Sequence, residues 1–281
     1  MAEQARSVEA VPLDIAERKL SHAQRLYQSR PARTIFILLT LAMAWEAYGR
    51  YLDNALLFPT FSETLVALSH EIMSGELLAR TATSLRVLLT GYAIGFVLAV
   101  ILTCVAMSSQ LARDYLTTVT SMLNPLPAIA LLPLALIWFG LGTNSVLFVL
   151  VHSVLWPLAL NLQTGFEGVP PVMRMVGRNY GLKGWRFVLR ILIPAAFPSI
   201  LSGLKIAWAF AWRTLLAAEL VFGVSSGSGG IGWFIYQRKN QLDIPAVFSG
   251  LLAVILIGLV VENLVFRTIE NRTVRRWGLQ S

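Results

Sequence analysis

Charged side chains inside an apolar segment are the residues of this sequence best suited to chemistry. The segment from about 200 to 224 carries Trp212, Arg213 and Glu219 among apolar residues. An ionised side chain facing lipid at mid-bilayer costs about 2.5 to 3.5 kcal/mol, so Arg213 and Glu219 should face the protein interior or an aqueous cavity. Because they are six residues apart, they lie on different faces of one helix. Arg213 beside Trp212 either attracts an anionic solute or forms an interhelical ion pair that fixes packing.

The other polar residue types do not cluster in a pattern typical of enzymes. The three histidines are scattered, and the single cysteine, Cys104, lies in an apolar run. The sequence holds no Gly-x-x-x-x-Gly-Lys-Ser/Thr motif, and the glycine-rich GSGGIGWFI stretch lacks that order. We therefore expect no catalytic residue, no metal site and no cofactor bound by this chain. His152 stands alone in an apolar segment, where a hydrogen bond to a neighbouring helix is the expected role.

A basic segment, residues 165–203, separates two apolar segments. Its basic residues are Arg174, Arg178, Lys183, Arg186 and Arg190, set against one acid, Glu167. An excess of lysine and arginine beside membrane spans is typical of cytoplasmic loops. The segment is therefore predicted to lie on the cytoplasmic side.

The basic segment has an internal helix pattern. Met173, Val176 and Tyr180 fall at i, i+3 and i+7, which predicts a short amphipathic helix. Gly181 can adopt the positive φ common at a helix C-terminus, and a second apolar stripe begins at Trp185. Pro194 and Pro198 then predict a bend before the chain re-enters the membrane. Such a helix either lies on anionic lipid or docks into a groove on a partner.

The run GRNYGLKGWRFVLRILIPAAFPSILSGL resembles the cytoplasmic EAA loop of permease subunits of binding-protein-dependent ABC importers. Gly181 matches the family's glycine, and Ile191 with Pro194 matches its Ile-x-x-Pro ending. The family's Glu-Ala-Ala is replaced by Met175, Val176 and Gly177. The stretches PLPAIALLPLALIWFGLG, GLKIAWAFAWRTLLAAEL and GSGGIGWFI extend the resemblance over most of residues 45–277, to the nitrate/sulfonate/taurine/bicarbonate branch.

The resemblance implies an all-α, polytopic type I ABC importer permease fold with six transmembrane helices. It implies a homodimer that passes a small anionic, sulfonate-, taurine- or nitrate-like solute from a periplasmic substrate-binding protein to the cytoplasm by alternating access. Two separate ABC ATPase subunits would hold ATP and Mg. The coupling residues would be Met173, Val176, Gly177, Arg178, Tyr180, Gly181, Leu182, Trp185 and Pro194, within a coupling loop at 165–198.

Composition agrees with a membrane protein. Hydrophobic residues make up 56% of the chain and charged residues 14%, and the mean hydropathy is +0.66. The net charge of +8 comes from basic residues beside apolar segments, so the lipid bilayer rather than nucleic acid is the expected partner. The expected domains are a leader (1–33), a permease domain (34–266) and a tail (267–281). The leader is either a weak amphipathic helix or a disordered tail.

Six membrane spans are predicted at about 34–51, 85–107, 115–139, 145–162, 200–224 and 245–266. A short helix at 62–74 should lie between the first two. The second span contains Gly91 and Gly95 at a spacing that allows close helix packing. The third is interrupted by Pro125, Pro127 and Pro133, and it is either part of the translocation route or a kinked structural helix. The predicted route residues are Pro127, Pro133, Trp212, Arg213 and Glu219.

Charge distribution predicts the orientation of these spans. The proposed inner segments hold 16 lysines and arginines, and the outer segments hold 5. Both termini are therefore predicted to be cytoplasmic, in a bacterial inner membrane. An ion-coupled secondary transporter is the alternative, but only Glu219 and Glu262 could carry coupling ions and no internal repeat is visible.

Overall fold

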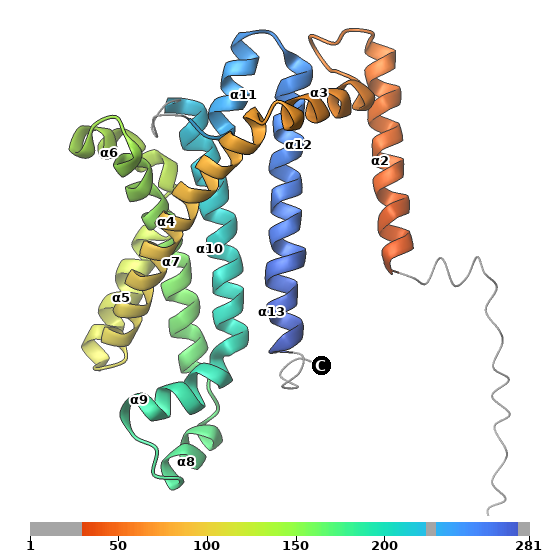
Figure 1. Ribbon diagram of the computed structural model, residues 1–281. Helices are drawn as coiled ribbons and strands as arrows, with labels where there is room; N and C mark the ends of the chain where they lie inside the picture. Colours follow the sequence, from red (N-terminus) through yellow and green to blue (C-terminus); the bar gives the residue numbers. More distant parts are fainter. Residues whose placement is uncertain (1–29, 223–228, 275–281) are drawn as a thin grey trace, which may run out of the picture.

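The computed structural model describes residues 30–222 and 229–274, and every regular element in those ranges is helical (Figure 1). Most of the predicted leader, the 225–228 part of the Ser/Gly stretch and the end of the tail lie outside the described residues. The first elements are α2 (Arg30–Leu52), α3 (Phe61–Met73), α4 (Glu76–Ala106), α5 (Gln110–Leu123), the 3-10 turn η1 (Ala128–Leu131) and α6 (Leu132–Phe139). They are followed by α7 (Thr143–Glu167), α8 (Pro171–Asn179), α9 (Gly184–Phe187), the π-helix η2 (Val188–Leu192) and α10 (Ile193–Phe222). The last are α11 (Ile231–Asn240), α12 (Ile244–Val260), the π-helix η3 (Val261–Phe266) and α13 (Arg267–Arg272).

Five continuous helices in the described residues are long and apolar enough to cross a membrane. They are Ala32–Leu52, Glu76–Ala106, Thr143–Glu167, Gly184–Val221 and Ile244–Arg272. The third predicted span is instead a bent pair, α5 followed by η1 and α6, with an angle of 87° between its halves. Six apolar spans are thus present when the bent pair counts as one.

Two span boundaries differ from the prediction, and one of them is the start of the fifth apolar helix, which begins at Gly184 and not near residue 200. The second span begins at Glu76, not near residue 85, because the helix starts directly after Gly75, whose φ is +78°. The polar residues 76–84 were assigned to an outer loop, but polarity alone does not prevent a helix from continuing above the membrane. The predicted short helix at 62–74 is confirmed as α3, which begins with a capping box made by Thr60 and Glu63.

The prolines of the third and fifth spans have different effects, and Pro133 differs from the prediction. Pro133 lies in the first turn of α6, where a missing amide costs nothing, so it does not interrupt the helix. Pro194 and Pro198 lie within α10, so neither proline ends the helix. Figure 1 shows the chain changing direction between α9 and α10. The π-helix η2 precedes them, with the amide of Ile193 bonded to the carbonyl of Val188, and this wider turn lets the helix pass the missing amide of Pro194.

Helix α7 is the centre of the bundle and packs on α4 and on α10. A Cβ atom on Gly91 or Gly95 would lie 2.7 Å from the Cβ atom of Leu150 or Val154, so α4 can approach α7 only because these residues are glycines. The predicted packing role of this glycine pair is therefore confirmed. On the other side, Gly203 of α10 meets Asn161, where an added Cβ would lie at 2.6 Å.

The long helices run between two ends of the molecule, and each end carries different short helices (Figure 1). Helices α8 and α9 lie at one end, and α13 points towards it, whereas α3 and α11 lie at the other end. Helix α2 begins about half-way along the bundle and runs towards α3. Helix α2 stands apart from the bundle along much of its length and is joined to it near α3. Trp45 packs there against Phe58, Phe61 and Phe248, with ring centroids 5.5 to 5.9 Å apart.

Candidate coupling and translocation sites

The turn that ends α8 has the hydrogen bonds of a Schellman motif. Gly181 has φ +69°, its amide donates to the carbonyl of Arg178 at 2.9 Å, and the amide of Leu182 donates to the carbonyl of Gly177 at 3.0 Å. A Cβ at Gly181 would meet nothing within 4 Å, so the glycine is required by its backbone conformation and not by space. The predicted pair of short helices joined at a glycine is confirmed.

Gly177 holds α8 against the next helix. The glycine is buried, and an added Cβ would lie 2.7 Å from Cε2 of Phe187 and 2.9 Å from Cγ1 of Ile191. Of the three positions that replace the family's Glu-Ala-Ala, this is the buried one, since Met175 and Val176 are exposed. The α8 helix is therefore packed directly on the start of the span that becomes α10.

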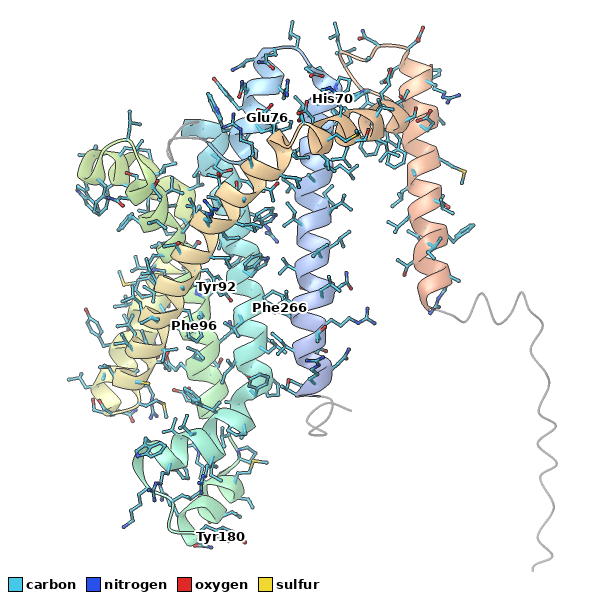
Figure 2. The ribbon with its side chains drawn as sticks, viewed as in Figure 1. His70, Glu76, Tyr92, Phe96, Tyr180 and Phe266 are labelled. Carbon is cyan, nitrogen blue, oxygen red and sulfur yellow. The ribbon has the colours of Figure 1, made fainter. Side chains whose placement is uncertain are left out.

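The predicted apolar stripe of α8 is not covered by the described chain. Met173 and Val176 are exposed, and Tyr180 and Trp185 are 82% and 69% exposed. Figure 2 shows Tyr180 at the tip of this end of the molecule. Met173, Val176 and Pro194 share an open groove of about 290 Å³ with Ile191, and Arg190 stands beside them. Most of the predicted coupling residues are therefore exposed, whereas Leu182 and Pro194 are half-buried and Gly177 is buried beneath them.

Arg174 attaches this surface to the central helix. Its guanidinium Nη2 donates to the carbonyl of Phe166 at 2.7 Å and to that of Glu167 at 3.3 Å, both at the C-terminus of α7. A cation there satisfies carbonyls that lack helical partners and interacts favourably with the helix dipole. Sequence reasoning counted Arg174 among the basic residues of the segment and missed this contact.

A cavity of about 370 Å³ lies where the break in the third span meets α7 and α10. The break contributes residues 124–129, and the two helices contribute His152, Ser153, Trp156, Pro157, Phe210, Arg213, Thr214 and Ala217. Two of the predicted route residues, Pro127 and Arg213, line it. Pro133, Trp212 and Glu219 do not.

Arg213 forms no ion pair with any described residue, so the packing alternative considered for it is not what the structure shows. Its guanidinium lies over the Phe210 ring of the same helix, 5.9 Å from the centroid. Lys205, on the same helix, does form ion pairs. Its Nζ lies 2.8 Å from Glu270 and 3.5 Å from Glu262 of the last span.

Family comparison agrees with this geometry. The model of a family described as the inner membrane component of binding-protein-dependent transport systems matches residues 84–275. The chain belongs to this family. This chain is 26% identical to the putative aliphatic sulfonates transport permease of Bacillus subtilis strain 168 over 232 residues, which cover 82% of each chain. The nitrate import permease of Synechocystis sp. PCC 6803 is 32% identical over 181 residues, covering 63% of this chain and 64% of the relative.

A further relative and a solved structure extend the comparison. The taurine transport system permease of Escherichia coli K12 is 28% identical over 164 residues, 58% of each chain. A crystal structure described as an amino acid ABC transporter with histidines has a TM-score of 0.54 at 17% identity, covering 74% of the permease and 97% of that chain. The predicted resemblance to ABC importer permeases of the nitrate, sulfonate and taurine branch is confirmed, as is the predicted all-α fold.

Glu219 of the permease is a clamp between helices. The side chain is 4% exposed and accepts hydrogen bonds from the hydroxyl of Ser84 on α4, at 2.8 Å, and from the amide of Gly232 on α11, at 2.8 Å. The Ser84 hydroxyl in turn accepts from the amide of Ile231 at 2.8 Å. A carboxylate at the start of α11 is favoured by the unpaired amides there.

The contact of Glu219 with the start of α11 explains why the turn before α11 is rich in glycine. A Cβ on Gly230 would overlap the Glu219 carboxylate and the Ser84 hydroxyl, and one on Gly232 would lie 2.6 Å from Cβ of Glu219. The backbone of the GGIG stretch can therefore lie directly on the carboxylate. Sequence reasoning noted both the turn and the acid but had no signal that connected them.

Replacing Ser84 with alanine should destabilise the permease by about 1 to 3 kcal/mol, because the buried Glu219 carboxylate and the Ile231 amide would each lose a partner. Reversible unfolding in mixed detergent micelles measures the change. Ser69→Ala is the control, since the Ser69 hydroxyl donates only to the nearby carbonyl of Val66 on an exposed surface. Equal stabilities of the two variants would show that the clamp contributes little.

Arg238 of α11 is the centre of an ionic cluster that sequence reasoning missed. Its Nη2 lies 2.8 Å from Glu71 of α3 and 3.0 Å from Glu76 of α4, and its guanidinium lies 5.3 Å from the centroid of the Phe234 ring. The Glu71 side chain is only 4% exposed. Figure 2 shows Glu76 at the end of the molecule opposite to Tyr180. The cluster joins three helices at that end.

Proposed function

We propose that this permease is the membrane-spanning subunit of an ATP-driven importer that moves small anions into the cytoplasm. It works in the bacterial inner membrane as a homodimer, with two ABC ATPase subunits on the cytoplasmic side and a periplasmic substrate-binding protein on the other. The permease is not itself the enzyme, and ATP and Mg belong to the ATPase subunits. The sulfonate, nitrate and taurine permeases among its relatives support an anionic solute.

The exposed apolar surface of α8 is the observation that carries the proposal. Tyr180 and Trp185 project from a well-capped turn, and a short amphipathic helix with an uncovered apolar face suits docking into a groove. Burial of such side chains supplies most of the free energy in a contact of this kind. A partner at this end of the molecule is the ATPase subunit.

The end of the molecule that carries α8 and α9 is the cytoplasmic end in this proposal. Helix α13 points towards this end, and α2 runs away from it towards α3 (Figure 1), which supports the prediction that both termini are cytoplasmic. The basic residues of the coupling loop also lie there, in keeping with the excess of lysine and arginine on the inner side.

The coupling loop is joined to both helices that line the cavity. Arg174 bonds to the end of α7, and Gly177 packs on Phe187 and Ile191, which lead into α10. Movement of α8 with the ATPase would therefore shift α7 and α10 together. Alternating access follows if ATP stabilises one arrangement and the solute-loaded binding protein stabilises the arrangement that it contacts better.

The intramembrane acids give no support to the ion-coupled alternative. Glu219 is held by Ser84 and Gly232, and Glu262 lies 3.5 Å from Lys205, so each acid has a structural partner. Neither lines the cavity.

Replacing Arg178 and Tyr180 together with aspartate should release the ATPase subunit. The permease would be expressed with its neighbouring open reading frames, extracted in mild detergent and tested for ATPase retention. The change puts two negative charges on the exposed docking surface, and the expected loss is more than tenfold.

A matched control makes the same kind of change at the opposite end. Tyr51 and Lys239 are both exposed, and the Tyr51→Asp/Lys239→Asp variant should retain the ATPase subunit. Retention by both variants would exclude docking at α8. Failure of the wild-type permease to hold any ATPase subunit would contradict the proposed function itself.

A further inference from the structure

The last membrane span changes its winding near the proposed cytoplasmic end. Helix α12 is regular from Ile244 to Val260, and the π-helix η3 then leads into α13. The amide of Arg267 donates to the carbonyl of Glu262, five residues back, whereas an α-helix closes each turn over four residues. The π-helix therefore holds one residue more than α-helical winding needs.

The extra residue decides which side chains of this segment face α10. In an α-helix each residue turns the chain by about 100°, so Glu262 and Glu270, which are eight residues apart, would point about 80° away from each other. When the π-helix absorbs one of the eight residues, the difference falls to about 20°. Both carboxylates can then reach the same cation.

Lys205 of α10 is that cation. Its Nζ lies 2.8 Å from Oε2 of Glu270 and 3.5 Å from Oε1 of Glu262. Phe266, midway between the two acids, is 6% exposed and packs beside Trp208 of α10, with ring centroids 6.4 Å apart. The π-helical winding thus presents two acids and one aromatic ring to a single face of α10.

An α-helical winding of the same residues would place a different side chain opposite Lys205. Ile269 lies seven residues after Glu262, close to two full α-helical turns, so Ile269 would take the place of Glu270. Helix α13 would turn by about 100° about its axis, and Lys205 would lose its 2.8 Å ion pair. The ion pair with Glu270 therefore belongs to one of two windings of the segment.

We propose that the inner end of the last span is a register switch, in which Lys205 holds the π-helical winding and its release lets α13 rotate into α-helical winding. The proposal rests on the proposed function, since the coupling loop is what moves α10 and Lys205 with it. The outer part of α12 packs instead on α11, where Ala253 and Phe234 share a buried cluster. The switch lets the inner end follow a shift of α10 while the outer end keeps this packing.

Labelling of a buried position tests the switch without transport. In the full-length permease in lipid nanodiscs, Cys104→Ser removes the single cysteine, and Val274→Cys places a thiol where the side chain is 1% exposed, in a cluster with Leu201. Maleimide should label this background slowly. Lys205→Gln should raise the labelling rate by about tenfold or more, because rotation of α13 exposes the position. Arg272→Cys, at an exposed position, should label equally fast with and without Lys205→Gln.

Deletion of Leu264 separates a change of register from loosening of the helix end. Leu264 lies within η3 and is 66% exposed, and its deletion removes the extra residue. The segment then keeps Glu270 opposite Lys205 in α-helical winding and has no second register. Added to Lys205→Gln, the deletion should return the labelling of Val274→Cys to the slow rate of the background. The switch is overturned if Lys205→Gln leaves the rate unchanged, or if the rate stays high after the deletion.

Uptake by proteoliposomes containing the complete transporter tests whether transport uses the switch. Deletion of Leu264 should lower uptake by about tenfold or more while the permease still retains the ATPase subunit, because α13 can no longer change register. Leu264→Ala keeps the number of residues and should transport as the wild type does. Wild-type uptake in the deletion variant would overturn the role of the switch in transport.

The fate of the ATPase subunit separates this inference from the proposed function. Wild-type permease that retains the ATPase but shows no effect of Lys205→Gln on labelling would overturn the switch and leave the importer intact. Permease that shows the labelling pattern but never retains an ATPase would leave the two windings standing and contradict the proposed function.

Discussion

Replacing Gly181 with valine should abolish ATP-dependent uptake while the permease still inserts into the membrane. Gly181 has φ +69°, a conformation that costs an ordinary L-residue about 1 to 2 kcal/mol and a β-branched one more. The cost falls on α8, a helix of nine residues that depends on its cap. Loss of the cap would move Tyr180 and its neighbours away from the partner, because the Leu182 bond to Gly177 could not form. Uptake by proteoliposomes containing the complete transporter measures the effect.

Gly181→Asn is the matched control, since asparagine adopts positive φ more readily than other residues with a side chain. A Cβ at this position meets nothing within 4 Å, so asparagine fits and most of the uptake should remain. Normal uptake by the valine variant would remove the main support for a rigid coupling turn. Loss of uptake in both variants would instead point to the bare backbone of Gly181 as a contact with the partner.

The coupling loop could be predicted because its signals are local. Met173, Val176 and Tyr180 are separated by helical spacings, and Gly181 stands directly after the helix that it caps. Neither feature depends on the rest of the fold, and the structure agrees with both. The resemblance to a known loop then added the partner, which no pattern of spacing could supply.

The prolines show where local reasoning fails. Pro125 and Pro127 lie at a real break, whereas Pro133 begins a helix and Pro194 follows a π-turn. The missing amide of proline thus breaks a helix at one position, begins a helix at another and is tolerated within a helix at a third. The outcome depends on whether the carbonyl that the amide would have bonded finds another donor. Single-residue rules cannot anticipate a π-helix, because its hydrogen bonds join residues five apart and are not specified by any one residue.

Distant contacts were the part of the site that the sequence did not reveal. Ser84 and Glu219 are 135 residues apart, and Arg238 and Glu71 are 167 apart. Glu219 was predicted to face the protein interior or an aqueous cavity, and the structure shows it buried against a hydroxyl and a glycine backbone amide. A count of charges placed Arg238 on the outer side and gave no indication that it neutralises a buried acid.

Replacing Arg238 with alanine should destabilise the permease by about 3 to 5 kcal/mol, the usual cost of removing one partner from a buried ion pair. The Glu71 side chain is 4% exposed, and among the residues that the structure describes it would keep only His70, whose Nδ1 lies 4.0 Å away. The free energy of unfolding in mixed detergent micelles measures the loss. Arg80→Ala should cost less than about 1 kcal/mol, because the Arg80 pair with Glu76 is more exposed and lies at 3.4 Å.

The double variant Arg238→Met/Glu71→Gln decides what the loss means. It removes the buried charge together with its partner, and an isosteric neutral pair is often as stable as the ion pair that it replaces. We therefore expect it to recover most of the stability lost in Arg238→Ala. If the double variant is as unstable as the single one, the contacts of the guanidinium with Glu76 and with the Phe234 ring, and not the pairing of Glu71, hold α3, α4 and α11 together.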